Sequence, residues 1–215
     1  MTTLCLVNDA QIAPANFATL TRALSYYMPL VTKAWGIAEV TVTSGVPKAT
    51  DWQIILTEKN RHAGASGYHN PSTIPMAYCS PRAAYRLFGT YHPPFVVKGR
   101  TINGERFLPG LITTICHEAA EMVLDPFVKT FSSLDSKARS WLVEICDPVM
   151  GSFLVYTDPI TKVNCVLADL VTPSFYDVKG VAPYSLKHAV SAPFTMTKSG
   201  YAFYKSATGA LVRVV

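Results

Sequence analysis

One segment near the middle of the chain combines an apolar helical pattern with a group of charged side chains. Apolar residues recur at helical spacing between 111 and 123, and Pro109 stands where a helix can begin, because proline is tolerated in the first turn. Asp125-Pro126 ends the pattern. The spacing predicts a helix that packs into a core, so the charged residues that it carries need an explanation.

These charged residues are His117, Glu118 and Glu121. His117 and Glu121 are four positions apart and therefore share one face of a helix, with Glu118 beside them. This is the HExxH arrangement of zinc peptidases with glutamate in place of the second histidine. In those enzymes the outer pair binds the metal ion and the inner glutamate is the general base. We therefore expect His117 and Glu121 as metal ligands and Glu118 as the catalytic base.

The position of the acidic residues along this helix also indicates a cation. Glu118, Glu121 and Asp125 fall in the last turns, where the helix dipole disfavours each anion by about 0.3–1 kcal/mol. Glu121 and Asp125 are like charges four residues apart, and no lysine or arginine follows before Lys129. A bound cation would offset this repulsion. The alternative is a solvated acidic helix face that carries one histidine.

Further ligands have to come from other segments. Asp125 lies about 12 Å beyond His117 along a helix axis, too far for both to bind one ion, so we expect it to cap the helix or orient a ligand. Glu144 and Asp147 are three residues apart, and both can reach the ion if their segment is helical, whereas only one can if it is a strand. His69, in an expected loop, is a further candidate beside the ligands.

The remaining chain indicates one α+β domain over residues 1–215. We expect an amphipathic helix over 14–34, a loop over 61–75 and a second helix over 134–145. Short strands are expected at 40–43, 52–56, 76–79 and 95–97. Further strand-like pieces predict a β-rich C-terminal part from about residue 150: 152–156, 163–167, 201–204 and 211–215.

Composition excludes several classes of protein. Residues of the hydrophobic set make up 49% and charged residues 15%, which excludes a disordered chain. No segment approaches the ~18 apolar residues of a membrane helix, so no membrane partner is expected. The net charge of +5 is spread over single residues, which gives no footprint for specific nucleic-acid binding. The five cysteines form no CxxC pair and are expected as buried thiols in a reducing compartment.

Several strings resemble a family of tailed-bacteriophage and prophage proteins described as zincin-like metallopeptidases, over most of the chain from about residue 50 onward. They are Gly67-Tyr68-His69, His117-Glu118-Ala119-Ala120-Glu121-Met122 with Asp125-Pro126, Glu144-Ile145-Cys146-Asp147-Pro148-Val149, Asp169-Leu170-Val171-Thr172-Pro173, Phe175-Tyr176, Ala192-Pro193-Phe194 and Ser199-Gly200-Tyr201.

This resemblance implies a zincin-like fold, in which a mixed sheet packs on the helix that carries the HExxE motif. It also implies that His117 and Glu121 bind a divalent metal, that Glu118 is the base, and that Glu144 or Asp147 completes the ligand shell. The family's loop tends to continue with aspartate where this chain has Asn70. Because two carboxylates make the site rich in oxygen, calcium and manganese are alternatives to the expected zinc.

Two functions follow from these observations. The first is a virion-associated structural protein, such as a tail, neck or capsid-surface subunit, found in the virion and in the host cytoplasm during assembly. The low charge, the aromatic residues and the 15 prolines favour it, with other virion proteins and further copies of itself as partners. The second is an active metal-dependent peptidase, which requires an open coordination position and an edge strand, such as 76–79, to hold an extended peptide substrate.

Overall fold

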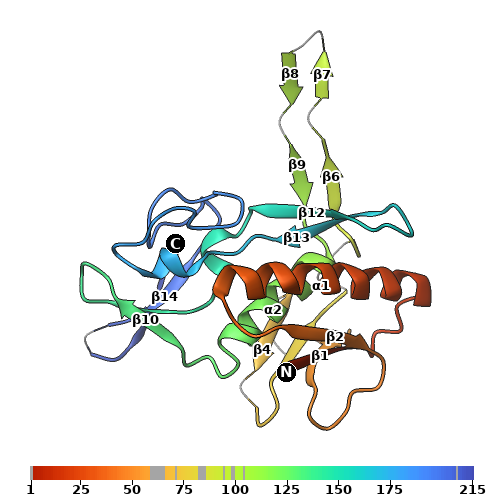
Figure 1. Ribbon diagram of the computed structural model, residues 1–215, viewed down its shortest axis with the longest axis horizontal. Helices are drawn as coiled ribbons and strands as arrows, with labels where there is room; N and C mark the ends of the chain where they lie inside the picture. The colour runs from red at the N-terminus through yellow and green to blue at the C-terminus, as the bar shows by residue number, and fades with distance from the viewer. Residues whose placement is uncertain are drawn as a thin grey trace.

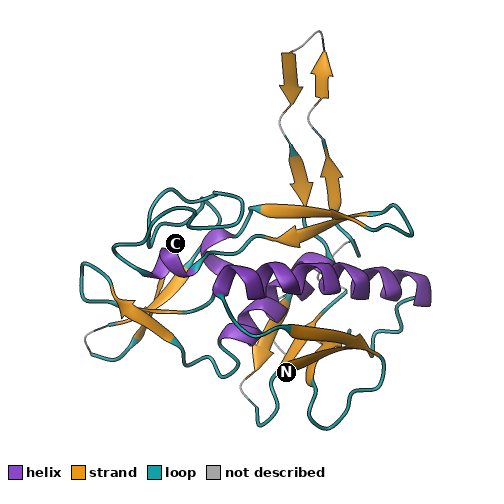
Figure 2. Cartoon of the chain, viewed as in Figure 1, coloured by secondary structure: helices purple, strands orange, loops and turns teal. Residues whose placement is uncertain are grey.

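The computed structural model describes residues 2–58, 66–70, 72–81, 86–93, 95–97, 100–103, 105–206 and 208–215, the segments 95–97 and 100–103 by their backbone alone. It is a mixed α+β structure, as the sequence predicts. Two α-helices, α1 (Pro14–Trp35) and α2 (Leu111–Leu124), contact each other beside a five-stranded sheet (Figure 1, Figure 2). Among the described residues, no helix is both long and apolar enough to span a bilayer.

The five-stranded sheet has the order β2-β1-β3-β5-β4. Its strands are β1 (Thr2–Asn8), β2 (Val40–Ser44), β3 (Trp52–Leu56), β4 (Gly67–Asn70) and β5 (Met76–Cys79). Four of the strands run parallel, and β4 pairs antiparallel with β5. The sheet is therefore mixed, and within the described residues β2 and β4 are its edges.

Helix α1 confirms the helix expected over 14–34. Pro14 lies in its first turn, and the chain leaves the helix at Gly36, whose φ of 62° is a left-handed conformation that glycine adopts without strain. Its apolar stripe is buried against the sheet and α2, and includes Leu20, Leu24, Tyr27, Met28 and Val31.

Helix α2 confirms the helix expected from the pattern at 111–123. It begins after Gly110, whose N–H donates to Thr113 Oγ1 at 3.0 Å, and ends at Asp125. Strands β4 and β5 contact α2, and so does β13 (Asn164–Ala168) from the second half of the chain. Because α2 is covered from more than one side, most of its residues are buried, including both glutamates.

The second half of the chain consists mainly of short strands. Strand β6 (Thr90–His92) pairs with β9 (Arg106–Leu108), and β7 (Phe95–Val97) pairs with β8 (Arg100–Asn103). Figure 1 shows these two pairs in line, as an arm that extends away from the body of the molecule. The other elements are β10 (Phe131–Leu134), β11 (Ser140–Leu142), β12 (Phe153–Thr157), β14 (Ala202–Lys205), β15 (Leu211–Val214) and the 3-10 helices η1 (Asp147–Val149) and η2 (Pro173–Tyr176).

Most of the expected strands are present. The strands expected at 40–43, 52–56, 76–79 and 95–97, and the four in the C-terminal third, lie within one or two residues of observed strands. The loop expected over 61–75 is wrong in part, because β4 lies inside it, while residues 61–65 and 71 are outside the described residues. The strands that were not predicted are β1, β4, β6, β8, β9, β10 and β11.

The helix expected over 134–145 is wrong. The segment forms the antiparallel pair β10–β11, and the turn between them is organised by Asp135. Asp135 Oδ1 accepts the backbone N–H groups of Lys137 at 2.8 Å and Arg139 at 2.9 Å, and Ala138 has a positive φ of 56°. A side chain that bonds to the backbone in this way competes with the helical hydrogen bonds, so the turn replaces the helix.

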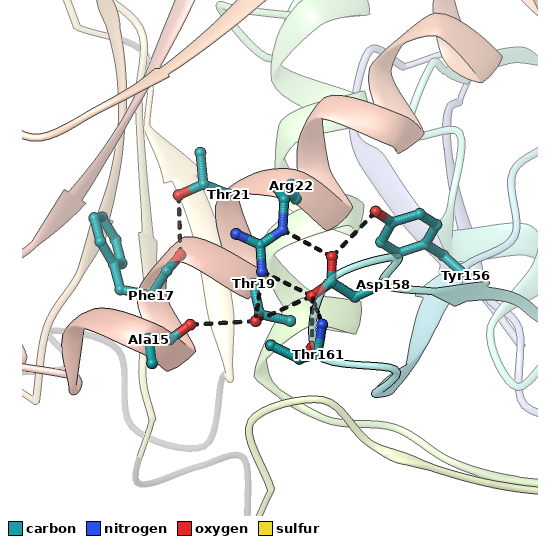
Figure 3. A network of polar contacts seen from close by, with 8 residues as sticks. All are labelled: Ala15, Phe17, Thr19, Thr21, Arg22, Tyr156, Asp158 and Thr161. Atoms are coloured by element: carbon teal, nitrogen blue, oxygen red, sulfur yellow. Dashed lines mark hydrogen bonds and ion pairs between the residues drawn. The ribbon is translucent and has the colours of Figure 1, made fainter.

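A polar network joins α1 to the β12–β13 hairpin (Figure 3). Arg22 forms two hydrogen bonds of 2.7 Å to the carboxylate of Asp158, which is completely buried. The backbone N–H of Thr161 also donates to Asp158, at 3.0 Å, and Thr19 and Tyr156 complete the contacts. The network fixes the hairpin on the face of α1 that is turned away from the sheet.

Candidate metal centre

Six ionisable side chains from three parts of the chain meet beside α2. We call this group the buried cluster: His69, His117, Glu118, Glu121, Glu144 and Asp147. His69 comes from β4, the three central residues from α2, Glu144 from the segment that follows β11, and Asp147 from the first position of η1. The structure thus brings together the predicted ligands and base with His69, which belongs to a strand and not to a loop.

The centre of the cluster is the pair that the helical spacing predicts. His117 Nε2 lies 3.1 Å from Glu121 Oε2, one turn further along α2. The other oxygen of Glu121, Oε1, accepts the backbone N–H of Cys146 at 3.1 Å. The carboxylate of Glu121 is therefore held in position by a group outside the helix, with Oε2 turned toward the histidine.

Asp147 reaches the same point from η1. Its Oδ1 atom is 3.2 Å from His117 Nε2. Two ligand atoms that bind one ion at about 2.0–2.2 Å in tetrahedral geometry lie roughly 3.3–3.6 Å apart, so both contacts of His117 are close to the spacing that a metal ion requires. Cys146 also belongs here, because ligand atoms of His117, Glu121 and Cys146 lie within 4.8 Å of one another.

The other half of the cluster forms where β4 crosses α2. A Cβ atom on Gly67 would lie 2.5 Å from Thr114 Cγ2 and 2.8 Å from Glu118 Oε1, so only glycine permits this approach. The approach places His69 over the helix. Its Nδ1 atom is 3.5 Å from Glu118 Oε2, and its Nε2 atom is 3.9 Å from Glu144 Oε1.

Nearly all of these groups are removed from water. The four carboxylates are buried, whereas the side chain of His117 keeps 18% of its surface exposed. The ion pairs formed by the described residues give the four carboxylates histidine partners, but no lysine or arginine. A buried carboxylate without a counter-ion is costly, so the cluster needs protons or a metal ion to neutralise it.

The pKa shifts follow from burial and crowding. Burial, together with the charges of Glu121 and Asp147, raises the pKa of Glu144 to about 11. Burial and Glu121 also raise the pKa of Asp147, to about 6, although His117 opposes the shift. Burial disfavours the charged form of His117, but Glu121 and Asp147 outweigh it, and the pKa of His117 rises well above its usual value.

The cluster therefore binds protons where a metal ion could bind instead. Burial and the coulombic attraction of His117 act in opposite directions on Glu121, and the pKa of Glu121 is lowered. Burial also opposes protonation of His69, yet its hydrogen bond to Glu118 raises the pKa of His69. In the metal-free protein these shifts favour the charged forms of His69 and His117 and the neutral form of Glu144.

Asp125 lies buried at the end of α2, and its charge acts on His69 and Glu144. Its Oδ1 atom accepts the backbone N–H groups of Lys129 at 2.8 Å and Thr130 at 3.0 Å. The residue therefore caps the turn that follows the helix, in agreement with the expected capping role. Asp125 is also the residue at which α2 ends, and its backbone N–H donates to the carbonyl oxygen of Glu121 in the last turn.

Two residues at the site were missed by the sequence analysis. Cys146 was considered only as one of five scattered thiols, all of which are unpaired and buried. Tyr201 contacts Asp147 through its side chain, and its backbone N–H donates to Asp147 O at 3.1 Å. Cys146 is adjacent to a predicted ligand, and Tyr201 belongs to the string Ser199-Gly200-Tyr201 of the resemblance, but neither residue was expected at the site.

The fold and the site define a mixed α+β protein with buried His, Glu and Cys groups that could hold a metal ion. No family model matches the chain, and neither a curated protein nor a solved structure matches it. The assignment of a function therefore depends on the geometry of the buried cluster.

Proposed function

We propose that this protein is a metal-dependent hydrolase with a zincin-like core, in which His117, Glu121 and Asp147 hold a divalent cation and Glu118 is the general base. One observation carries the proposal: His117 Nε2 has carboxylate oxygens at 3.1 and 3.2 Å from two different elements, and Glu118 lies buried beside it. A bound divalent ion would lower the pKa of water and polarise a carbonyl group.

The arrangement of the sheet and α2 supports a zincin-like core. The resemblance implies a mixed sheet packed on the helix that carries the motif, and α2 contacts β4 and β5 of a five-stranded mixed sheet. The ligands on α2 face the segment that follows β11, so the ion would join α2 to this segment and to η1. Such a site contributes to folding as well as to chemistry.

The ligand set is compatible with more than one ion. The thiol of Cys146 and the imidazole of His117 favour zinc, which binds nitrogen and sulfur well. The carboxylates of Glu121 and Asp147 suit manganese or calcium. We expect zinc, because His117 supplies a nitrogen ligand and the thiol of Cys146 lies near enough to be an additional soft ligand.

An extended peptide is the substrate class that the sheet fits. The strand expected as a peptide-binding edge, 76–79, is β5, which is internal because it pairs with both β3 and β4. Among the residues that the structure describes, the edge on this side is β4, which carries His69. A peptide that pairs with β4 would lie beside the buried cluster, since main-chain hydrogen bonds at a sheet edge give such ligands their affinity.

A virion-associated structural role is the second candidate, and the projecting arm favours it. The arm formed by β6–β9 and β7–β8 extends from the body, and two-stranded ribbons of this kind are marginally stable in water (Figure 1). Tyr91 and Phe107 stack across it at 5.3 Å between ring centroids. Contact with other virion proteins or further copies would stabilise the arm, and the ion would then be structural.

Two substitutions test the proposal. Purified protein is analysed for bound zinc, and its hydrolysis of unstructured protein substrates is measured, as wild type, His117→Ala and Glu118→Gln. We expect His117→Ala to lose the metal and Glu118→Gln to keep it, with hydrolysis lost in both. Wild-type protein that binds metal but hydrolyses nothing would leave the structural role, and protein found in purified virions would support it. Wild-type protein that binds no metal contradicts the proposed site.

A further inference from the structure

We propose that the buried cluster binds a second divalent cation, between His69 and Glu144, and that Glu121 is shared by the two ions. The proposal rests on the proposed function in one respect, since the first ion is the one assigned to His117, Glu121 and Asp147. It adds His69 from β4 and Glu144 from the segment that follows β11, neither of which belongs to the HExxE motif.

The orientation of His69 indicates a metal ligand. Its two ring nitrogens face different carboxylates: Nδ1 lies 3.5 Å from Glu118 Oε2, and Nε2 lies 3.9 Å from Glu144 Oε1. A histidine that binds a metal through one nitrogen commonly donates the other N–H to a carboxylate, which fixes the ring and its tautomer. Glu118 is placed to accept that hydrogen bond from Nδ1, which leaves the lone pair of Nε2 directed at Glu144.

The atoms between His69 and Glu144 lack partners. His69 Nε2 and Glu144 Oε2 are buried and form no hydrogen bond with the residues that the structure describes. Their side chains are only 6% and 9% exposed, so water does not reach them freely. Buried polar atoms are nearly always satisfied, and two unsatisfied acceptor atoms on neighbouring side chains, the lone pair of His69 Nε2 and Glu144 Oε2, indicate that a cation belongs beside them.

The separation of these groups fits an ion. Atoms that bind one ion at about 2.0–2.2 Å lie roughly 3–4 Å apart, according to their angle at the metal, and His69 Nε2 and Glu144 Oε1 are 3.9 Å apart. A hydrogen bond needs a shorter distance than this one. The gap is therefore too wide for a direct contact and suits two ligands of one cation.

Glu121 connects this position with the first ion. Ligand atoms of His69, Glu118 and Glu121 lie within 4.8 Å of one another, and so do those of His117, Glu121 and Cys146. Glu121 is the one residue common to both groups. A shared carboxylate is how proteins hold two ions about 3.5–4 Å apart.

The charge of the cluster also fits two ions. Glu118, Glu121, Glu144 and Asp147 carry four negative charges when ionised, and with one divalent cation two of these charges would have to be neutralised by protons in a buried site. A second divalent cation balances all four with both histidines neutral. The four carboxylates are therefore enough to balance two divalent ions, and a second ion would replace protons that the cluster otherwise binds.

Metal stoichiometry and magnetic coupling test this inference without an activity assay. Metal-free full-length protein is titrated with Mn²⁺ alone, bound metal is counted by elemental analysis after gel filtration, and the EPR spectrum is recorded. We expect two equivalents per chain and the spectrum of an exchange-coupled Mn²⁺ pair. Wild-type protein that binds one equivalent at saturation, or two without coupling, overturns the inference.

Variants locate the second ion. Glu144→Gln, which keeps the shape of the side chain, and His69→Ala are each expected to bind one uncoupled Mn²⁺, while His92→Ala, at an exposed position of β6, keeps two. Circular dichroism shows whether each variant is folded. Folded Glu144→Gln and His69→Ala proteins that still hold a coupled pair contradict the assigned position.

The same measurements separate the two proposals. If the wild type binds one equivalent of Mn²⁺ that is lost in His117→Ala and kept in His69→Ala, the proposed function is retained and the second site is removed. One equivalent that is lost in His69→Ala and kept in His117→Ala removes the ligand set of the proposed function, and no binding by the wild type removes both.

Discussion

Asp147 Oδ1 lies 3.2 Å from His117 Nε2, although the aspartate belongs to a 3-10 helix and the histidine to α2. The aspartate is held on its other side by Tyr201, whose backbone N–H donates to Asp147 O at 3.1 Å. The contact therefore joins α2 to the C-terminal third of the chain. It makes Asp147, and not only the residues of the helix motif, a decisive part of the proposed site.

Asp147→Asn should weaken metal binding. The amide keeps the size of the side chain but removes the negative charge that faces His117, and changes near a metal commonly reduce affinity about 10–100-fold. Competition titration with a chromophoric zinc chelator measures the change. Asp177→Asn, at an exposed position, is the matched control and should bind zinc like the wild type. Equal affinities for the Asp147→Asn and control proteins would remove Asp147 from the ligand set.

The stability of the metal-free protein should fall as the pH rises from 5.5 to 8. The pKa of Glu144 is raised to about 11, so its contribution is complete below its unfolded value near 4.5 and is lost as the pH rises toward 11. Asp147, with its pKa raised to about 6, acts in the same direction between about 3.8 and 6. We expect a decrease of about 1–3 kcal/mol in the free energy of unfolding.

Urea denaturation with a chelator present measures this pH dependence. Glu144→Gln cannot ionise and should show a flatter dependence than the wild type. Saturating zinc should abolish the decrease, because the ion displaces the protons and binds more tightly at higher pH. A metal-free wild-type protein whose stability is constant or rises between these pH values would show that the carboxylates of the cluster do not retain protons.

Gly67→Ala should destabilise the protein through contact with α2. The new Cβ would lie 2.5 Å from Thr114 Cγ2 and 2.9 Å from Glu118 Cγ, which forces β4 away from the helix. Overpacking of this kind costs about 1–3 kcal/mol. Thermal unfolding measures the loss, and the double variant Gly67→Ala/Thr114→Ser should recover part of it, because serine lacks the Cγ2 methyl group. Unchanged stability of the single variant would mean that β4 does not approach α2 so closely.

Asp158→Asn should loosen the attachment of the β12–β13 hairpin to α1. The substitution removes the charge that pairs with Arg22 through two contacts of 2.7 Å (Figure 3). Because the Arg22 side chain is 29% exposed, water can solvate it in part, and we expect a loss of about 2–3 kcal/mol. Chemical denaturation measures the free energy of unfolding of Asp158→Asn, and Glu39→Gln, at an exposed position, is the control. A loss as small as that of the control would show that the pair contributes little.

Local pattern determined the two helices and most strands, because each depends on neighbours in sequence. The apolar spacing at 111–123 specifies α2, and the short apolar runs at 52–56 and 76–79 specify strands, although 76–79 was expected at a sheet edge and is internal. The pattern failed over 134–145, where Asp135 bonds to the backbone of the residues that follow it. Helical spacing of apolar residues cannot reveal a side chain that competes for backbone hydrogen bonds.

The sequence by itself determined that His117, Glu118 and Glu121 share one helix face, since four residues make about one turn. Only the tertiary structure decided that Glu144 and Asp147 both reach them from a segment that is neither the expected helix nor a strand. It also decided that β4 brings His69 onto the same helix. These contacts depend on how distant segments pack, and a linear pattern fixes the direction of a side chain only within its own element.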